Sequence, residues 1–326
     1  MAFDKRVEVG LENLSAGAID VLRQKIDIRL SELYRENAKD TRLVCAMRHA
    51  LLSPGKRFRP IITLLSHAES GGDLEDAVDA ACAIEMVHAA SLIMDDLPSM
   101  DDARLRRGRL ATHVVFGEGT GMLAAVALLN EAYRVIANGR AGDPAEKMRA
   151  ICHLTNAVGP DGLAGGQERD IMCGGAEPDA NSLKEIEQRH LEKTGALFAA
   201  AAAIGAELAG ADKARVQKMH EYGVALGLAY QAFDDVIDVE GTMESTGKDV
   251  SQDQGKSTVV SLLGREGARR SAGRWLGRAI EASEEGAEPG RPVLLAALAR
   301  KIGKKFGVLA IEEDAEKVKQ RRPLST

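Results

Sequence analysis

The chain has 326 residues and a formal net charge of −6 at pH 7, and 45% of its residues are hydrophobic but only 3% aromatic. The acidic balance argues against nucleic acid as a partner. No stretch approaches the roughly 18 apolar residues of a membrane span, and residues 1–10 lack the apolar core of a signal peptide. Four scattered cysteines without a CxxC pair indicate free thiols and a cytoplasmic location, not a disulfide framework or zinc site (Cys45, Cys82, Cys152 and Cys173).

Apolar residues recur at helical spacing along most of the chain, and strand-like runs are scarce. Helices are expected, in chain order, at 11–36, 41–53, 61–67, 74–97, 120–137, 144–172, 183–209 and 211–239. The breaks at 70–72, 139–144, 174–181 and 241–257 gather glycine, proline and polar residues. The small residues of 196–211 predict close helix packing. No break differs enough in composition to mark a linker, so the sequence predicts one all-α domain over residues 1–326.

Two clusters of aspartates each follow an apolar helical stretch. The first is Asp95-Asp96-Leu-Pro-Ser-Met-Asp101-Asp102, and the second is Asp234-Asp235-Val-Ile-Asp238. Asp234 and Asp238 lie one helical turn apart, where like charges are destabilising unless a cation lies between them. In the first cluster Pro98 removes a backbone donor and loosens the turn, which lets Asp95 and Asp101 approach the same ion.

A carboxylate triplet alone is often only a solvated helix face. Here apolar neighbours such as Phe233 and Val236 flank the second cluster and indicate a partly buried cleft. Mg²⁺ keeps several waters and needs only one or two carboxylates besides diphosphate oxygens. A calcium-binding EF-hand is excluded because its central glycine and final glutamate are missing. The two clusters therefore predict chemistry on a diphosphate ester.

Basic residues occur at four places along this acidic chain. They are Lys56, Arg57 and Arg59 in one turn, Arg106 and Arg107 after the first acidic cluster, Lys193 in a helix, and Lys248 and Lys256 in the long polar break. Arginine binds phosphate oxygens bidentately and lysine binds them as a point charge. Each group alone is commonly a set of exposed surface residues without a binding role. Together, the four groups fit a second diphosphate that is held without metal. His88 lies two turns before Asp95, where it is either a core residue or a member of the same cleft.

Together these elements resemble the trans-isoprenyl diphosphate (polyprenyl) synthase family over roughly residues 30–280. The matching motifs, in order, are Gly55-Lys56-Arg57-Phe58-Arg59-Pro60, His88, Asp95 to Asp102 with Leu105-Arg106-Arg107-Gly108, Gly166-Gln167-Glu168-Arg169-Asp170, Lys193-Thr194, Gln231 to Asp238, and Gly255-Lys256-Ser257-Thr258. Each motif is weak, but seven in the right order are specific. The form of the first acidic cluster is most similar to bacterial geranylgeranyl diphosphate synthases of the carotenoid type. Residues after about 283 match nothing in the family.

The resemblance implies the all-α isoprenoid synthase fold around a central cavity, a homodimer and three Mg²⁺ ions. It also implies a prenyltransferase that condenses isopentenyl diphosphate head to tail with dimethylallyl, geranyl or farnesyl diphosphate. The metal ligands it implies are Asp95 and Asp101 for two ions and Asp234 for the third, supported by Asp96, Asp235 and Asp238. It implies that isopentenyl diphosphate is bound by Lys56, Arg59, His88 and Arg107. The allylic diphosphate is implied to bind Arg106, Lys193 and Lys248, and Lys256 is a further substrate-binding residue. Thr194 and Gln231 are implied to line the site of the carbocation.

Product length is expected to depend on Ala90 and Ser91, which precede the first acidic cluster on its helix. In relatives that stop at fifteen carbons, an aromatic residue often fills the first of these positions. Ala90 leaves the pocket open, so the expected product is the twenty-carbon geranylgeranyl diphosphate, with farnesyl diphosphate (fifteen carbons) as the alternative.

Two more distant alternatives are a class I terpene cyclase and a non-catalytic subunit or helical scaffold. A cyclase normally carries an Asn/Asp-x-x-Ser-x-x-x-Glu second metal motif, where this chain has an aspartate-rich one. A non-catalytic subunit is expected to have lost part of an aspartate motif, and both are intact here. The basic stretches 300–305 and 320–322 are interpreted as a solvated tail.

Overall fold

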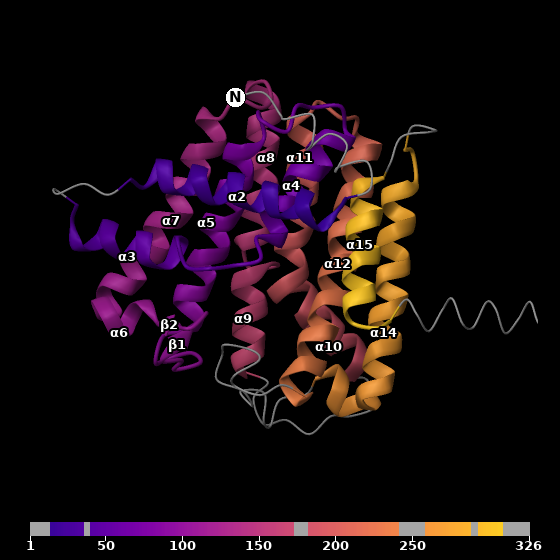
Figure 1. Cartoon of the computed structure of the whole chain (residues 1–326). Coiled ribbons are helices and arrows are strands. Elements are labelled where there is room, and N and C mark those ends of the chain that lie inside the picture. The colour runs from indigo at the N-terminus through magenta and orange to yellow at the C-terminus, as the bar shows by residue number, and fades with distance from the viewer. Residues whose placement is uncertain (1–13, 36–39, 173–181, 241–257, 288–292, 309–326) are drawn as a thin grey trace, which may run out of the picture.

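The computed structural model describes residues 14–35, 40–172, 182–240, 258–287 and 293–308. These residues form helices packed side by side, with one small hairpin (Figure 1), so the all-α prediction is confirmed. The elements are α2 (Ala16–Leu33), α3 (Arg42–Leu51), α4 (Phe58–Glu69), α5 (Val78–Asp95), β1 (Leu105–Arg106), β2 (Arg109–Leu110), α6 (Thr112–Phe116), α7 (Glu118–Asn138), α8 (Pro144–Val158), α9 (Leu163–Met172), α10 (Ser182–His190), the π-helical turn η1 (Leu191–Gly195), α11 (Ala196–Leu208), α12 (Lys213–Glu240), α14 (Val259–Glu284) and α15 (Leu294–Lys305).

Helices α5 and α11 form the interior of the bundle. Most of their residues are buried on every side, as expected of a helix that is apolar all round. α11 packs against α4, α8 and α12, and α5 packs against α7. A Cβ at Gly205 would lie 2.4 Å from the Thr63 carbonyl oxygen, so α4 and α11 touch through backbone at this point. The predicted role of the small residues in close packing is confirmed.

The two acidic clusters lie where two long helices end. α5 ends at Asp95 and α12 runs through Asp234 to Glu240. The hairpin β1–β2, in which Leu105 pairs with Leu110, lies at the same end of the bundle as α9 and α10, at the bottom of Figure 1. This end of the bundle therefore gathers the segments that carry the sequence motifs.

Several expected boundaries were wrong. The predicted helix 144–172 is two helices, because Gly159 ends α8 and the backbone turns through Gly162 before α9 begins. The predicted helix 183–209 contains the π-helical turn η1. Helices α14 and α15 lie beyond the last expected helix, and residues 300–305 belong to α15 rather than to a solvated tail. Within the described residues no helix is long and apolar enough to cross a membrane, and Cys45, Cys82 and Cys152 are free thiols.

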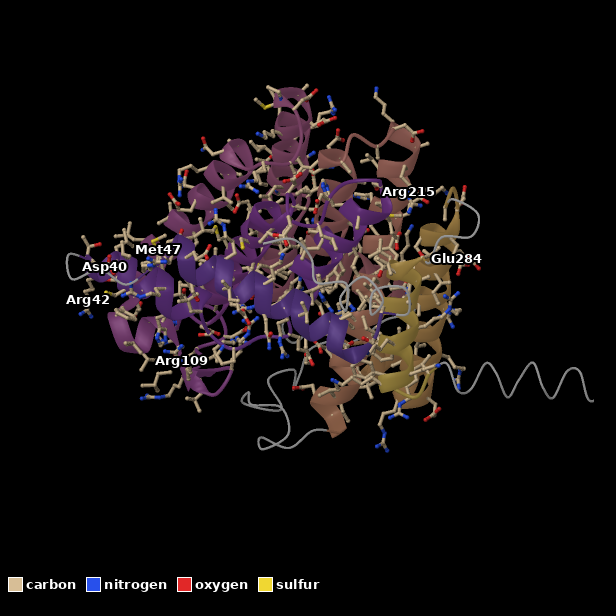
Figure 2. The ribbon with its side chains drawn as sticks, turned by 45° about the horizontal axis from the view of Figure 1, so that its top comes forward. Asp40, Arg42, Met47, Arg109, Arg215 and Glu284 are labelled. Atoms are coloured by element: carbon tan, nitrogen blue, oxygen red, sulfur yellow. The ribbon has the colours of Figure 1, made fainter. Side chains whose placement is uncertain are left out.

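Helix α15 is docked on the bundle through buried polar contacts. Glu69 accepts a hydrogen bond from the Leu295 N–H at 2.7 Å and pairs with Arg215 at 3.1 Å. Arg215 also donates to the Ser283 carbonyl at 3.1 Å, and Figure 2 shows it at the start of α12, beside the end of α14. The Phe306 ring, at the end of α15, stacks on Phe233 with centroids 4.1 Å apart. The C-terminal helices thus support the segment of α12 that precedes Asp234.

Glu69→Ala is expected to destabilise the protein by about 3 kcal/mol, because it leaves the largely buried Arg215 without its carboxylate partner and the Leu295 N–H without its acceptor. Chemical denaturation followed by circular dichroism measures the change. Glu32→Ala removes an exposed carboxylate paired with Arg29 and is the control, with an expected effect within about 0.5 kcal/mol. Equal effects of the two substitutions would contradict the docking role of Glu69.

Candidate active site

The first wall of the site is the C-terminal end of α5 and the turn that follows it. The Asp101 N–H donates to the Asp95 carbonyl at 2.9 Å, so the loosened turn folds Asp101 back over Asp95 as the sequence predicted. Burial, together with the neighbouring charge of Asp101, raises the pKa of Asp95 to about 6, although the Lys193 ammonium opposes this shift. Two carboxylates held this close in a buried place favour a cation between them.

Asp96, which follows Asp95 in sequence, faces away from Asp95 and Asp101. Asp96 is 3% exposed and accepts hydrogen bonds from both Nε and Nη2 of Arg106, the Nε bond being 2.8 Å long. Arg106 is in β1, so the ion pair ties the hairpin to the end of α5. Asp96 therefore supports the wall instead of lining it.

The second wall lies on α12, and its carboxylates likewise have two different roles. Asp234 and Asp238 are partly exposed on one face of α12, whereas Asp235 is 3% exposed. Asp235 accepts hydrogen bonds from the Val259 N–H at 3.1 Å and from Gln231 Nε2 at 3.2 Å. Asp235 thus ties the start of α14 to α12, as Asp96 ties the hairpin to α5.

The π-helical turn η1 places Lys193 and Thr194 between the two walls. Lys193 Nζ donates to Asp170 of α9 at 2.6 Å, and Thr194 Oγ1 donates to Gln231 Oε1 at 2.8 Å. A Cβ at Gly227 would lie 2.6 Å from the Gly195 Cα, so only a glycine lets α12 approach η1 this closely. π-helical turns are frequent at functional sites because they redirect side chains from a regular helix.

Asp170 belongs to one of the family motifs, but the sequence did not predict its contact with Lys193. Its carboxylate also lies 3.5 Å from Arg189 Nε. The spacing Gly166-Gln167-Glu168-Arg169-Asp170 was the available signal, but the partner Lys193 lies on another helix and is not predictable from spacing. The side-chain amide of Gln167 is buried without a hydrogen-bond partner, another polar group that the sequence analysis left unassigned.

The basic part of the site lies at the start of α4 and beside α5. Arg59 Nε is buried without a hydrogen-bond partner, and its guanidinium lies 4.3 Å from the centre of the Phe198 ring. His88 Nε2 accepts from Arg107 at 3.1 Å and lies 3.5 Å from Arg59 Nη1. Burial and the surrounding arginines lower the pKa of His88 well below its ordinary value, so the ring is neutral and serves as an acceptor. Positive charge here comes from the arginines, not from His88.

The apolar lining of this region comes from aromatic residues of three helices. The ring of Tyr230 lies 5.6 Å from that of Phe198 and 6.0 Å from that of Phe58. Asp234, one turn after Tyr230, contributes to the field at Arg59. The second acidic wall and the basic cluster therefore share one region of the protein.

Five predicted site residues remain: Lys56, Lys248, Lys256, Ala90 and Ser91. Lys248 and Lys256 lie outside the described residues, and Lys56 is exposed. Ala90 is 1% exposed within the main hydrophobic core. Ser91 is half-buried and shares the α5 face of His88 and Asp95 by helical spacing. Ser91 is thus the nearer of the two candidate pocket residues to the cleft.

The fit of a metal ion was tested against these carboxylates. Among the described residues, no group of three or more histidine, cysteine or carboxylate side chains encloses a metal on its own. Mg²⁺ retains water and shares its coordination with substrate phosphates, so pairs of carboxylates suit it. The desolvation of Asp95 and its repulsion by the charge of Asp101 are relieved by a cation. The residues present therefore fit Mg²⁺ bound together with a diphosphate.

Comparison with known proteins gives consistent results. Residues 40–288 match the family model described as polyprenyl synthetase. A geranylgeranyl diphosphate synthase of Pantoea ananas is 42% identical over 254 residues, which cover 77% of this chain and 82% of that protein.

Two solved structures share the fold. An FPP/GFPP synthase of Zymomonas mobilis aligns with a TM-score of 0.77 at 32% identity, over 90% of this chain and 99% of that one. A geranyltransferase of Helicobacter pylori, complexed with magnesium and isoprenyl diphosphate, aligns with a TM-score of 0.76 at 26% identity, over 89% and 97%. The matched family region contains both acidic walls, η1 and the basic cluster, and the chain belongs to the polyprenyl synthetase family.

Proposed function

We propose that the protein is a geranylgeranyl diphosphate synthase, which extends allylic diphosphates with isopentenyl diphosphate in a Mg²⁺-dependent reaction. The observation that best supports the proposal concerns the environment of Arg59. Its buried Nε–H has no acceptor, and no described carboxylate forms an ion pair with it, although it lies in the field of Asp234. A buried N–H without an acceptor is costly, and a bound diphosphate supplies the missing oxygen atom.

The residues proposed to hold Mg²⁺ are Asp95 and Asp101 on one wall and Asp234 on the other, with three ions in all. Asp96, Asp235 and Asp238 support them, and the two buried members do so through Arg106 and through the start of α14. When bound, Mg²⁺ acts as a Lewis acid on the diphosphate that leaves the allylic substrate. The structure of the Helicobacter pylori relative, named as a magnesium complex, supports this choice of metal.

The protein's own groups are proposed to act on two diphosphates. Arg106, Lys193 and Lys248 bind the allylic diphosphate, and Lys56, Arg59, His88, Arg107 and Lys256 form the site for isopentenyl diphosphate. The cations stabilise the charge that builds on the departing diphosphate. The hydroxyl of Thr194 and the amide of Gln231, hydrogen-bonded to each other, face the positive carbon centre with their oxygen atoms.

The remaining contributions are orientation and the exclusion of water. The aromatic side chains Phe58, Phe198 and Tyr230 form an apolar wall beside Arg59. Such a wall keeps water from an allylic cation, and two ordered diphosphates place the alkene of isopentenyl diphosphate next to the carbon that it attacks. The proton released from the condensation product passes to the departing diphosphate.

The twenty-carbon product is supported by the small side chain of Ser91 on the α5 face of His88 and Asp95, whereas Ala90 is enclosed in the core. The name of the Pantoea ananas relative agrees with this length, whereas that of the Zymomonas mobilis structure specifies farnesyl and geranylfarnesyl products. The side chain of Ser91 donates to the His88 carbonyl at 2.9 Å and is thus held against its own helix. Farnesyl diphosphate is the second candidate product.

We further propose a cytoplasmic homodimer of a single-domain chain. The support for the dimer is an apolar surface formed by exposed side chains of α6 and α7 (Val115, Met122, Leu123 and Val126). Exposed apolar groups at this spacing favour a contact with another protein surface. Light scattering of the purified protein measures the state directly.

The proposed activity is tested by incubating the protein with isopentenyl diphosphate, Mg²⁺ and dimethylallyl, geranyl or farnesyl diphosphate in turn. The products are dephosphorylated and chromatographed. The expected product is the linear twenty-carbon alcohol. EDTA is expected to abolish its formation, because the described carboxylates are proposed to bind Mg²⁺ only together with the substrate diphosphate, so the metal is readily removed. A fifteen-carbon alcohol as the end product would contradict the chain length, and cyclic hydrocarbons would contradict the synthase activity itself.

A further inference from the structure

In sequence, Arg57 lies between Lys56 and Arg59, which are assigned to isopentenyl diphosphate. The surroundings of Arg57 differ from those of both residues. Its side chain is 2% exposed. Its Nε donates to Asp27 of α2 at 2.8 Å, Nη1 donates to Glu85 of α5, and Nη2 donates to the carbonyls of Leu51 and Ser53 at 3.3 and 2.8 Å. Four of its five N–H groups are thus used inside the protein. Arg57 has almost no capacity left for a substrate oxygen.

Glu85 is the centre of this arrangement. It is the acceptor of Arg57, its side chain is 2% exposed, and the same Oε1 lies 3.6 Å from Arg107 Nη1. One buried carboxylate therefore holds two guanidinium groups that come from different segments, the turn before α4 and the turn between β1 and β2. A Cβ at Gly55 would lie 2.8 Å from Arg107 Nη1. The glycine before Lys56 therefore leaves space for this approach.

The backbone indicates that both arginines are held in place. Arg57 has φ of 50° and Arg107 has φ of 54°, which are left-handed conformations that cost energy for any residue except glycine. The hydrogen bonds and ion pairs of Asp27, Glu85 and His88 provide compensating contacts at both positions. The same two turns deliver Arg59 and Arg106 to the site.

The connections continue from Glu85 towards the cleft. Arg107 donates to His88 Nε2, and His88 lies beside Arg59. The chain of contacts therefore runs from Asp27 on the outside, through Arg57 and Glu85, to the guanidinium groups that the proposed function assigns to isopentenyl diphosphate. Arg59 and Arg107 retain several N–H groups for a ligand, whereas Arg57 retains only one.

We propose that Glu85 is a positioning residue for the diphosphate site that lacks metal, and that Arg57 is the structural counter-cation of Glu85 and not a ligand of the substrate. Glu85 fixes Arg107, and through His88 it fixes Arg59, in the orientation that binds the diphosphate of isopentenyl diphosphate. This inference rests on the proposed function of the site. It assigns different roles to Arg57 and Arg59, two cations of the same motif.

The test is Glu85→Gln, which keeps the size of the side chain and one acceptor oxygen but removes the charge. The KM for isopentenyl diphosphate is expected to rise about tenfold to a hundredfold, because displaced guanidinium groups bind the diphosphate poorly. The KM for the allylic diphosphate is expected to change less than about twofold, since its cations are anchored by Asp96 and Asp170. Calorimetric titration of isopentenyl diphosphate in EDTA isolates the metal-free site and is expected to show the same loss of affinity.

Glu207→Gln is the matched control. Glu207 is also buried and accepts from Arg149 at 2.5 Å, but it lies at the end of α11 opposite to η1. Its substitution is expected to leave both KM values unchanged. If Glu85→Gln does not fold, the double variant Arg57→Met/Glu85→Met replaces the buried pair by apolar side chains, which proteins often tolerate. The double variant is expected to raise the same KM, because Arg107 still loses its acceptor.

An unchanged KM for isopentenyl diphosphate in a folded Glu85 variant would overturn the inference. An equal rise in both KM values would do so too, since it indicates a general structural loss. These outcomes differ from failure of the proposed function, in which the wild-type protein itself neither binds isopentenyl diphosphate in EDTA nor elongates an allylic diphosphate.

Discussion

Asp95→Ala is expected to lower kcat by about a thousandfold, because it removes a carboxylate that is proposed to bind the metal ions of the leaving diphosphate. Steady-state kinetics at saturating Mg²⁺ and both substrates measures the loss. The thermal midpoint is expected to stay the same or to rise, since the pKa of Asp95 is raised to about 6 by desolvation and by the charge of Asp101, which disfavours the ionised carboxylate in the folded state. Loss of activity with retained or increased stability is the signature of a residue kept for function.

Calorimetric binding of isopentenyl diphosphate in EDTA provides the internal control for Asp95→Ala. This binding is expected to persist, because Arg59 and Arg107 form their contacts without Asp95. A folded Asp95→Ala protein with kcat within tenfold of the wild type would show that the first wall does not hold the reacting diphosphate.

Ser91→Phe is expected to change the main product from twenty to fifteen carbons. Ser91 is half-buried on the α5 face of His88 and Asp95, so a phenyl ring at this position adds volume on the face proposed to line the path of the growing chain. Ala90→Phe is expected to shorten the product as well, but with a loss of stability of about 1–3 kcal/mol, because Ala90 is enclosed in the core. Chromatography of the dephosphorylated alcohols measures product length, and thermal denaturation measures stability.

The conservative substitution Ser91→Ala serves as the reference for product length. It removes the hydroxyl bond to the His88 carbonyl without adding volume, so the twenty-carbon product is expected to remain. If Ser91→Phe and Ala90→Phe both fold and both still release the twenty-carbon product, then neither residue limits the length of the chain.

The sequence predicted the general features of this protein well, because they depend on local patterns. Helical periodicity located most of the helices, and Pro98 correctly predicted that the backbone turns after α5 and brings Asp101 back to Asp95. The family was identified from seven short motifs, each of which places a specific residue type at a specific spacing. The family match confirms this prediction.

What the sequence did not predict depends on contacts between distant segments. The π-helical turn that holds Lys193 and Thr194 has no distinct local pattern, since Leu191–Gly195 continues the periodicity of α10 and α11. The helix α15 lies outside the family match and was interpreted as a basic tail, although Leu295 and Leu298 bury its apolar face. Its docking depends on Glu69, which is 226 residues away in sequence from Leu295.

The division of roles within each aspartate pair also required the structure. Asp95 and Asp96 are identical in residue type, as are Asp234 and Asp235, and neighbouring positions on a helix face different directions. The buried member of each pair stabilises a neighbouring segment, which is β1 for Asp96 and the start of α14 for Asp235. The same holds for Arg57 and Arg59, which share a motif but not an environment.

The central claim is that the two acidic walls bind one magnesium diphosphate between them. Calorimetric titration of inorganic pyrophosphate, with and without Mg²⁺, tests it in the wild type, Asp95→Ala and Asp234→Ala. We expect a Mg²⁺-dependent binding component in the wild type that is lost in each single variant, because each removes one side of the same site. If either folded variant retained the full Mg²⁺-dependent component, the two walls would not share a ligand and the account would be wrong.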